Sequence, residues 1–334
     1  MKHLLIIISI LLLSSPIFGQ SFVSVGNSGN IITSSDGISW TKRTSGTREY
    51  LKGVTYGNGL FMTVGPSGTI LTSTDGIYWT ERDSGTSESL RGVTYGNSTF
   101  VVVGENGTIL TSLNGTTWTE RTSGTSEDLY EVTYGNGLFV VVGENGTIIT
   151  SPDEYFWTER TSGISNKLYG VTYGNGLFVT VGTSGTILTS SDGNTWTERT
   201  SGTFDWFTNF YGVTHVRGLF VMVGSLGNIF TSIDGNSWTG RRSRTTNYLL
   251  GVTYGNGLFV TVGETGTILT SSNGIFWTKR TSGISKYLEG ITYGNGLFVT
   301  VGWKGTIFTS SDGNSWSQSN SGTIKYLRGV TYSQ

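Results

Sequence analysis

Residues Thr189–Arg199 read TSSDGNTWTER, and close variants of this stretch recur eight times along the chain. Each copy contains a tryptophan, and the spacing between successive tryptophans is 39 residues six times and 42 residues once. The eight tryptophans are Trp40, Trp79, Trp118, Trp157, Trp196, Trp238, Trp277 and Trp316. A repeat of this length, with strand-like sequence between the tryptophans, is typical of a radially repeated β architecture.

One repeat, residues 170–202, predicts four strands. GVTY is rich in β-branched and aromatic residues, and the GNG after it supplies the positive φ angles of a tight hairpin turn. LFVTVG and TILT are the second and third strands, and the apolar second strand suits a place between neighbouring sheets. The fourth strand, TERT, carries charged side chains, which protect an exposed sheet edge from aggregation. Each repeat is therefore predicted to form a four-stranded antiparallel sheet with a charged outer edge.

The two ends of the chain complement each other. The repeats begin at Phe22 without a GVTY strand, and the chain stops just after Gly329–Tyr332, which is such a strand. Pairing this last strand with the N-terminal strands completes an eighth sheet and closes a ring. The sequence thus predicts an all-β, eight-bladed propeller of about 39 residues per repeat, with residues 20–334 as one domain. A seven-bladed propeller and a β-solenoid with capping ends are the alternatives.

The composition and the N-terminal segment indicate where the protein is located and which partners it lacks. Residues 1–19 have a basic start (Lys2), an apolar run and small residues after it, which is typical of a signal peptide for secretion or periplasmic export. No later stretch is long and apolar enough to span a membrane. The 21 basic and 22 acidic residues leave no basic surface for nucleic acid, and the absence of cysteine excludes disulfides. We expect an exported monomer.

The recurring string S-x-D-G-x-x-W resembles the Asp-box of bacterial neuraminidase repeat propellers, over residues 21–334. That superfamily includes sialidases, other glycan hydrolases and photosystem II assembly or stability factors, so the resemblance implies a propeller fold. Glu154 departs from the string, since it replaces the box glycine. The Asp or Asn positions of the eight boxes are Asp36, Asp75, Asn114, Asp153, Asp192, Asp234, Asn273 and Asp312.

The box has a structural explanation in physical terms. An Asp or Asn oxygen can accept backbone N–H groups two residues on, the glycine tolerates positive φ, and the tryptophan fills the space between adjacent sheets. A calcium loop is disfavoured because each turn offers one carboxylate where the ion needs six or more oxygens. We therefore expect no metal and no cofactor.

A ligand site is expected where the repeats differ. In a propeller, the second-to-third-strand turns and the connections between blades share one face, and here these vary, whereas the GNG and box turns of the opposite face hardly do. The connection that contains the three-residue insertion, residues 203–211, is rich in aromatic residues, which are favoured at interfaces. The alternative is that Trp206 and Phe207 only cap a blade junction. The candidate ligand-binding residues are Trp206, Phe207, Phe210, Tyr211, Trp303, Lys304, Tyr248, Tyr287 and Tyr326.

These features favour an exported, non-enzymatic binding or scaffold protein that holds a glycan or protein partner. No catalytic residue is assigned: His215 is the only histidine after the signal segment, and Arg241, Arg242 and Arg244 cluster on one outer strand. The first alternative is a glycan hydrolase that uses a carboxylate pair from Glu105, Glu144, Glu264 and Asp205. The second, implied by the resemblance alone, is a homologue of the photosystem assembly factors.

Overall fold

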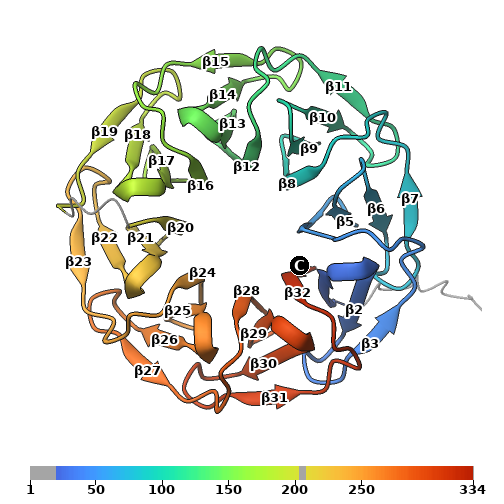
Figure 1. Ribbon diagram of the computed structural model, residues 1–334, viewed down its shortest axis with the longest axis vertical. Helices are drawn as coiled ribbons and strands as arrows, with labels where there is room; N and C mark the ends of the chain where they lie inside the picture. Colours follow the sequence, from blue (N-terminus) through green and yellow to red (C-terminus); the bar gives the residue numbers. More distant parts are fainter. Residues whose placement is uncertain (1–19, 203–207, 334) are drawn as a thin grey trace, which may run out of the picture.

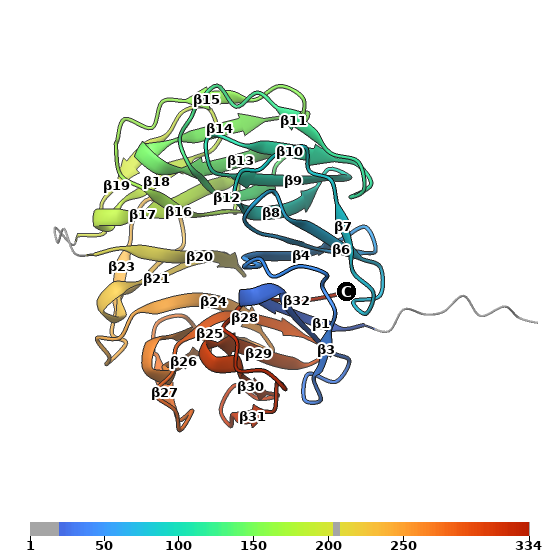
Figure 2. The same ribbon diagram turned by 45° about the vertical axis from the view of Figure 1, so that its right-hand side comes forward.

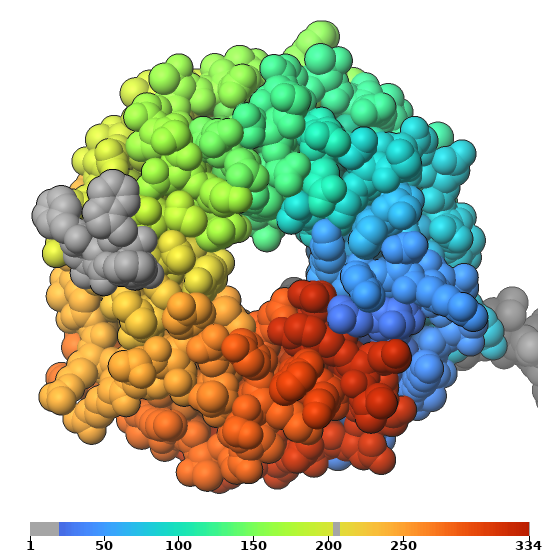
Figure 3. Space-filling view, in the orientation of Figure 1, coloured from blue at the N-terminus to red at the C-terminus, as the bar shows by residue number. Residues whose placement is uncertain are grey.

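The computed structural model describes residues 20–202 and 208–333. Its strands form eight antiparallel sheets of four strands each, arranged around a central channel (Figure 1). The space-filling view shows that side chains leave this channel open (Figure 3). The predicted eight-bladed propeller is confirmed, and the seven-bladed and solenoid alternatives are excluded.

In seven of the eight blades the chain passes in order from the inner strand, next to the channel, to the outer strand; in the remaining blade the inner strand comes from the C-terminal end of the chain. The inner strands are β4 (Gly53–Gly57), β8 (Leu90–Gly96), β12 (Leu129–Gly135), β16 (Leu168–Gly174), β20 (Phe210–Val216), β24 (Leu249–Gly255), β28 (Leu288–Gly294) and β32 (Leu327–Tyr332). The second strands are β1 (Phe22–Gly26), β5 (Leu60–Val64), β9 (Thr99–Gly104), β13 (Leu138–Gly143), β17 (Leu177–Gly182), β21 (Leu219–Gly224), β25 (Leu258–Gly263) and β29 (Leu297–Gly302).

The third strands are β2 (Asn30–Ser34), β6 (Ile70–Ser73), β10 (Ile109–Ser112), β14 (Ile148–Ser151), β18 (Ile187–Ser190), β22 (Ile229–Ser232), β26 (Ile268–Ser271) and β30 (Thr306–Ser310). The outer strands are β3 (Thr41–Arg43), β7 (Thr80–Arg82), β11 (Thr119–Arg121), β15 (Thr158–Arg160), β19 (Thr197–Arg199), β23 (Thr239–Arg241), β27 (Thr278–Arg280) and β31 (Ser317–Ser319). Blade 1 consists of β32 and β1–β3, blade 2 of β4–β7, and so on to blade 8, β28–β31.

The ring is closed by the two ends of the chain. Strand β32 pairs antiparallel with β1, so that Phe22 lies opposite Tyr332 and Val23 opposite Thr331. Both ribbon views place these strands side by side (Figures 1 and 2). The predicted seam is therefore confirmed, and β32 covers the inner edge of β1 as the inner strand does in every other blade.

The core lies between blades. Trp196, for example, is buried among Val140 and Val142 of blade 4 and Phe178 and Leu188 of its own blade. This arrangement follows from the sequence, because second strands that are apolar on both sides can be covered only by a sheet on each face. Packing between neighbours is thus what holds the blades at their angle.

Each third-to-fourth-strand turn, called a box turn below, is built as its sequence predicts. In all eight, one Asp or Asn side-chain oxygen accepts the N–H groups two and three residues on, as Asp192 does from Asn194 and Thr195. In seven of the eight, the indole N–H donates to the backbone carbonyl three residues before it, as in Trp196 to Gly193. The turn and the tryptophan therefore fix each other.

The outer-strand arginines also link the outer strand to the third strand. In seven blades the Arg Nε–H donates to a threonine hydroxyl of the third strand at 2.7–2.8 Å, as Arg199 does to Thr189. These arginines are half-buried braces between third and outer strands. No helix in the described part of the chain is long and apolar enough to cross a membrane.

Candidate functional site: the channel mouth on the loop-variable face

The loop-variable face surrounds one mouth of the channel, and a backbone irregularity decides which side chains line it. In seven inner strands the ladder to the second strand has a bulge one residue after a buried Leu or Phe; in β16, for example, Leu168 pairs with Gly182 and Gly170 with Val181. The skipped residue, here Tyr169, is unpaired, and a bulge re-aims such a side chain. We call these residues and their counterpart Lys52 the mouth ring: Lys52, Arg91, Tyr130, Tyr169, Tyr211, Leu250, Glu289 and Arg328.

Half of the mouth is aromatic. Ring centroids are 5.6 Å apart between Tyr130 and Tyr169, 5.9 Å between Tyr169 and Tyr211, and 6.0 Å between Tyr211 and Tyr248. Successive planes are inclined by 36–39°. These four residues, which we call the tyrosine arc, form a curved and partly exposed surface across blades 4 to 7. Aromatic rings at such separations attract one another, so the arc is held in place before any ligand arrives.

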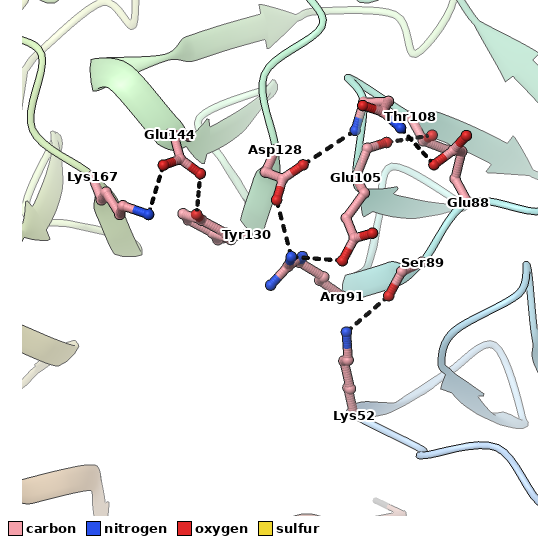
Figure 4. A network of polar contacts seen from close by, with 11 residues as sticks. Lys52, Glu88, Ser89, Arg91, Glu105, Thr108, Asp128, Tyr130, Glu144 and Lys167 are labelled. Carbon is pink, nitrogen blue, oxygen red and sulfur yellow. Dashed lines mark hydrogen bonds and ion pairs between the residues drawn. The ribbon is translucent and has the colours of Figure 1, made fainter.

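The other half of the mouth is cationic, with Arg328, Lys52 and Arg91 on three successive blades. Figure 4 shows how this half joins the tyrosines. One guanidinium nitrogen of Arg91 contacts Glu105 at 2.7 Å and Asp128 at 3.0 Å, while the guanidinium lies 5.1 Å from the centre of the Tyr130 ring. The mouth is therefore divided into an aromatic and a charged arc that meet at Arg91 and Tyr130.

A second group of contacts fixes the first tyrosine of the arc. Glu144 accepts from the Tyr130 hydroxyl at 2.7 Å and pairs with the Lys167 ammonium at 2.6 Å (Figure 4). Burial, followed by the bond to Glu144, raises the pKa of Tyr130 to about 12. The bond from Lys167, followed by that from Tyr130, lowers the pKa of Glu144. At neutral pH Tyr130 is therefore a neutral donor and Glu144 an ionised acceptor.

The ammonium of Lys52 is bound differently from the two arginines. It donates to the Ser89 hydroxyl at 2.9 Å, and no carboxylate pairs with it in the described part of the chain. Burial, with Arg91 next, lowers its pKa. Arg328, in contrast, pairs with Glu289 at 3.4 Å, and burial raises the pKa of that carboxyl.

The channel wall contains one further acid, Glu131. It occupies a place where the other seven inner strands have glycine, and its carboxylate accepts only the backbone N–H of Val132 among the contacts of the described residues. Its side chain is half-buried in the channel wall. Burial raises the pKa of Glu131 to about 7.

The candidates in the inserted connection have different outcomes. Trp206 and Phe207 lie outside the described residues. Phe210 was expected on the surface, and this is wrong: it is fully buried, replaces the leucine of the other inner strands, and packs edge-on against Phe230. Tyr211 and Tyr248 lie in the tyrosine arc.

The remaining candidates flank the mouth near blade 8. Trp303 is 45% exposed, and the Lys304 ammonium lies 4.9 Å from the centre of its ring. The backbone N–H of Trp303 donates to the Tyr287 carbonyl. Tyr287 is exposed, and its bond to Glu264 raises the pKa of the phenol. The Tyr326 ring lies 4.8 Å from the Arg328 guanidinium. These residues border the charged arc, and their binding role stays a prediction.

Sequence reasoning missed most of the mouth ring. Apart from Tyr211, the predicted candidates do not include the residue after the buried leucine, although that residue varies from Lys52 to Arg91 to Tyr130 inside a nearly constant L-x-G-V-T-Y string. Sequence reasoning also described the box turns as nearly invariant, and this needs correction. The position before the tryptophan presents Tyr78, Phe156 and Phe276, each more than three-quarters exposed, where other blades have Ser or Thr.

Two of the four acids considered for hydrolysis are ion-paired at the mouth, Glu105 with Arg91 and Glu144 with Lys167, and Asp205 lies outside the described residues. His215 packs on Phe220 at 4.4 Å toward the other end of β20, and burial lowers its pKa. Within residues 20–202 and 208–333, no three His, Cys, Asp or Glu side chains are placed to hold a metal ion.

Comparisons with known proteins identify the fold. No family model matches the chain, and no curated protein sequence does. The computationally designed propeller Ika8 is similar at 12% identity, with a TM-score of 0.70 and 92% of both chains covered. YCF48 bound to a D1 peptide is similar at 15% identity, with a TM-score of 0.63, 89% of this chain and 99% of that chain covered. Virginiamycin B lyase from Staphylococcus aureus is similar at 16% identity, with a TM-score of 0.63, 80% of this chain and 94% of that chain covered.

Proposed function

We propose that this protein is a non-catalytic binding propeller that holds an extended segment of a protein partner across the channel mouth. The observation that carries the proposal is the tyrosine arc. Three of its members, Tyr130, Tyr169 and Tyr211, occupy mouth-ring positions where the other five blades have Lys, Arg, Leu or Glu, so the fold itself does not require tyrosine there. Four partly exposed tyrosines, each ring tilted against the next at one end of an open channel, are best explained by a ligand that they contact.

A peptide suits both arcs of the mouth. Tyrosines supply contact area at low conformational cost together with a hydroxyl for backbone hydrogen bonds. Lys52, which lacks a carboxylate partner among the described residues, can pair with an acidic group of the same segment. The YCF48 structure contains a D1 peptide, so a propeller of this kind does accept a peptide. That likeness supports a protein partner and does not identify D1.

The proposal is tested by selecting a random peptide library, displayed on phage, on the purified protein. Affinities of the selected peptides are then measured calorimetrically for the protein and for a Tyr169→Ser/Tyr211→Ser double variant. We expect the double variant to bind at least about ten-fold more weakly, since loss of two central aromatic contacts typically removes more than 1.4 kcal/mol.

The matched control is Tyr78→Ser, which removes a tyrosine that is 79% exposed on a box turn, away from the mouth. It should leave affinity unchanged. Failure to select any peptide, or equal affinity of the double variant and the protein, contradicts the proposal. A glycan array that yields a ligand dependent on Tyr169 and Tyr211, when no peptide does, would assign the mouth to glycans instead.

We also propose that the chain is exported and acts as a monomer. Support for export comes from the apolar run after Lys2, and support for a monomer from the seam, where β1 is paired with the same chain's β32 and not with a second copy. N-terminal sequencing of the mature protein from its own cell tests export, with cleavage expected near Gly19. Light scattering tests the monomer.

A further inference from the structure

A groove on the rim between blades 6 and 7, away from the channel, has its own chemistry. It has a volume of 610 Å³ and lies between the outer strands β23 and β27. Its charged lining residues are Arg241, Arg242, Arg244 and Lys279, and none of the described residues that line it is acidic. Phe276, 77% exposed, borders it. We call it the rim groove.

The rim groove is basic because blade 6 departs from the repeat at three positions. Gly240 stands where four other blades have Glu, Arg242 where five have Thr, and Arg244 where the other seven have Gly. Gly240 has a packing reason, since a Cβ there would lie 3.3 Å from the Phe230 ring. Arg241 is the usual brace to Thr231. Arg242 and Arg244 are left without a structural explanation.

Arg244 is the most informative of these residues. Its φ is +60°, in the left-handed region, and the seven equivalent glycines have φ between +65° and +84°. At each of those glycines an added Cβ would meet nothing within 4 Å, so the fold has room for a side chain at this position and does not require one. Other turn residues such as Leu226 and Lys304 also adopt this strained region, but Arg244 replaces a glycine found in all seven other blades.

Three of the four rim-groove cations have no ion-pair partner among the described residues. No ion pair in the described part of the chain involves Arg242, Arg244 or Lys279. The corresponding groove between blades 8 and 1 is lined by Ile38, Asp312, Gln318 and Asn320 and by no cation among the described residues. The positive charge of the rim groove therefore comes from residues particular to blades 6 and 7 and is not a general feature of grooves between blades.

We infer that the rim groove binds an anionic polysaccharide through its carboxylate or sulfate groups. Guanidinium groups pair with such oxyanions in a bidentate manner, and an exposed aromatic ring such as Phe276 offers an apolar face for a sugar ring. A polymer suits cations that are spread over two blades. Nucleic acid is disfavoured, because four cations in one groove of a chain with 21 basic and 22 acidic residues do not form the extended basic surface that a long phosphate backbone needs. This inference is independent of the function proposed for the channel mouth.

The test uses heparin as a sulfated probe, polygalacturonate as a carboxylated probe and dextran as a neutral one. Dissociation constants of the purified protein are measured between 50 and 200 mM salt. We expect at least one anionic polymer to bind, with affinity that falls as salt rises, and dextran not to bind. Comparison of the two anionic probes distinguishes sulfate from carboxylate recognition.

Two variants restore residues that other blades have in the same place. Arg242→Thr/Arg244→Gly should weaken binding at least about ten-fold and flatten its salt dependence, because two charge-assisted contacts are lost. Phe276→Ser should weaken binding without changing the salt dependence. The matched control, Arg48→Thr/Lys325→Thr, removes two exposed cations outside the groove and should bind as the unmodified protein does.

Several outcomes would overturn the inference. They are no binding of either anionic polymer at 50 mM salt, equal affinity of the Arg242/Arg244 variant and the unmodified protein, and an equal loss in the control. A single-stranded oligonucleotide or phosphatidylglycerol vesicles that bind as tightly through the same arginines would also contradict a polysaccharide ligand. Thermal unfolding of each variant confirms that it is folded.

Discussion

Phe22 and Tyr332 come from opposite ends of the chain and face each other across the seam, with ring centroids 4.7 Å apart. The same pairing occurs within a continuous blade between Tyr56 and Phe61, also at 4.7 Å. The backbone bond from Ser333 to the Ser21 carbonyl, 3.0 Å, extends the seam by one residue. Contacts at the seam therefore match those of a blade that is one piece of chain.

We expect Tyr332→Ala and Tyr56→Ala to lower the free energy of unfolding by similar amounts, about 2 kcal/mol each, since both rings are partly buried against a phenylalanine. Urea denaturation measures both. Deletion of residues 327–334 should destabilise the protein far more, because it exposes the inner edge of β1. A Tyr332→Ala effect near zero beside a normal Tyr56→Ala effect would show that the seam is open in solution.

Asp36 allows a test of the box turn. Its carboxylate accepts from the Ser39 and Ile38 N–H groups at 2.7 and 2.8 Å, and these bonds lower its pKa from 3.8 to about 2. A lowered folded-state pKa gives stability that is present above pH 4 and is lost as pH falls toward 2. We expect Asp36→Ala to lose about 1 kcal/mol at pH 7, a value that allows for solvent screening of this exposed turn.

Asp36→Asn is the control, since Asn114 makes the same two backbone bonds in blade 3. It should be nearly as stable as the unmodified protein at pH 7 and lose less stability on acidification. Unfolding curves at pH 7 and pH 3 measure this. Equal acid sensitivity of Asp36→Asn and the unmodified protein would show that this carboxylate is not the titrating group.

The fold could be predicted because the information is periodic. The eight regularly spaced tryptophans specify the number of blades. The strand missing at the N-terminal end and the extra strand at the C-terminal end specify that the ring closes. The site could be predicted only in part. Tyr211 and Tyr248 were found as loop aromatics, but Tyr130 and Tyr169 depend on a bulge, which no local sequence rule placed at the channel mouth.

Phe210 shows why the remainder failed. An inserted connection rich in aromatics made it look like a surface residue, whereas counting back from Gly212-Val213-Thr214 places it in register with the buried leucines. Whether a residue of a repeat is buried depends on its register in the strand and not on the amino-acid composition of the segment around it. The same counting finds the variable position after each buried leucine and the aromatics of the box turns, but not the bulge that turns the mouth-ring side chains toward the channel mouth.

Glu131 should make stability depend on pH in the opposite direction to Asp36. Burial raises its pKa from 4.5 to about 7, so between these values the unfolded chain releases a proton that the folded protein keeps. Stability due to this group is therefore full below pH 4.5 and falls as pH rises to 7. We expect Glu131→Gln to be more stable than the unmodified protein at pH 8, by on the order of 2 kcal/mol, and equally stable at pH 4.

Urea denaturation at both pH values measures this difference, and Glu159→Gln on the exposed outer strand β15 is the control that should show none. An identical gain at pH 4 and pH 8 would assign the effect to packing and not to ionisation. The absence of any gain would mean that channel water solvates the Glu131 carboxylate fully.

Variants at Arg244 test whether this residue contributes to the stability of the fold or only to binding at the rim groove. Replacement by glycine removes the strain of φ +60° but adds the backbone entropy of glycine to the unfolded chain, and these effects oppose each other. We expect Arg244→Gly to leave the free energy of unfolding unchanged or to raise it by up to about 1 kcal/mol, while Gly202→Arg at the equivalent place in blade 5 lowers it by about 1 kcal/mol. Thermal unfolding of both variants measures the pair. A clear loss of stability in Arg244→Gly would show that this arginine has a structural role, and the strain at the rim groove would no longer point to a ligand.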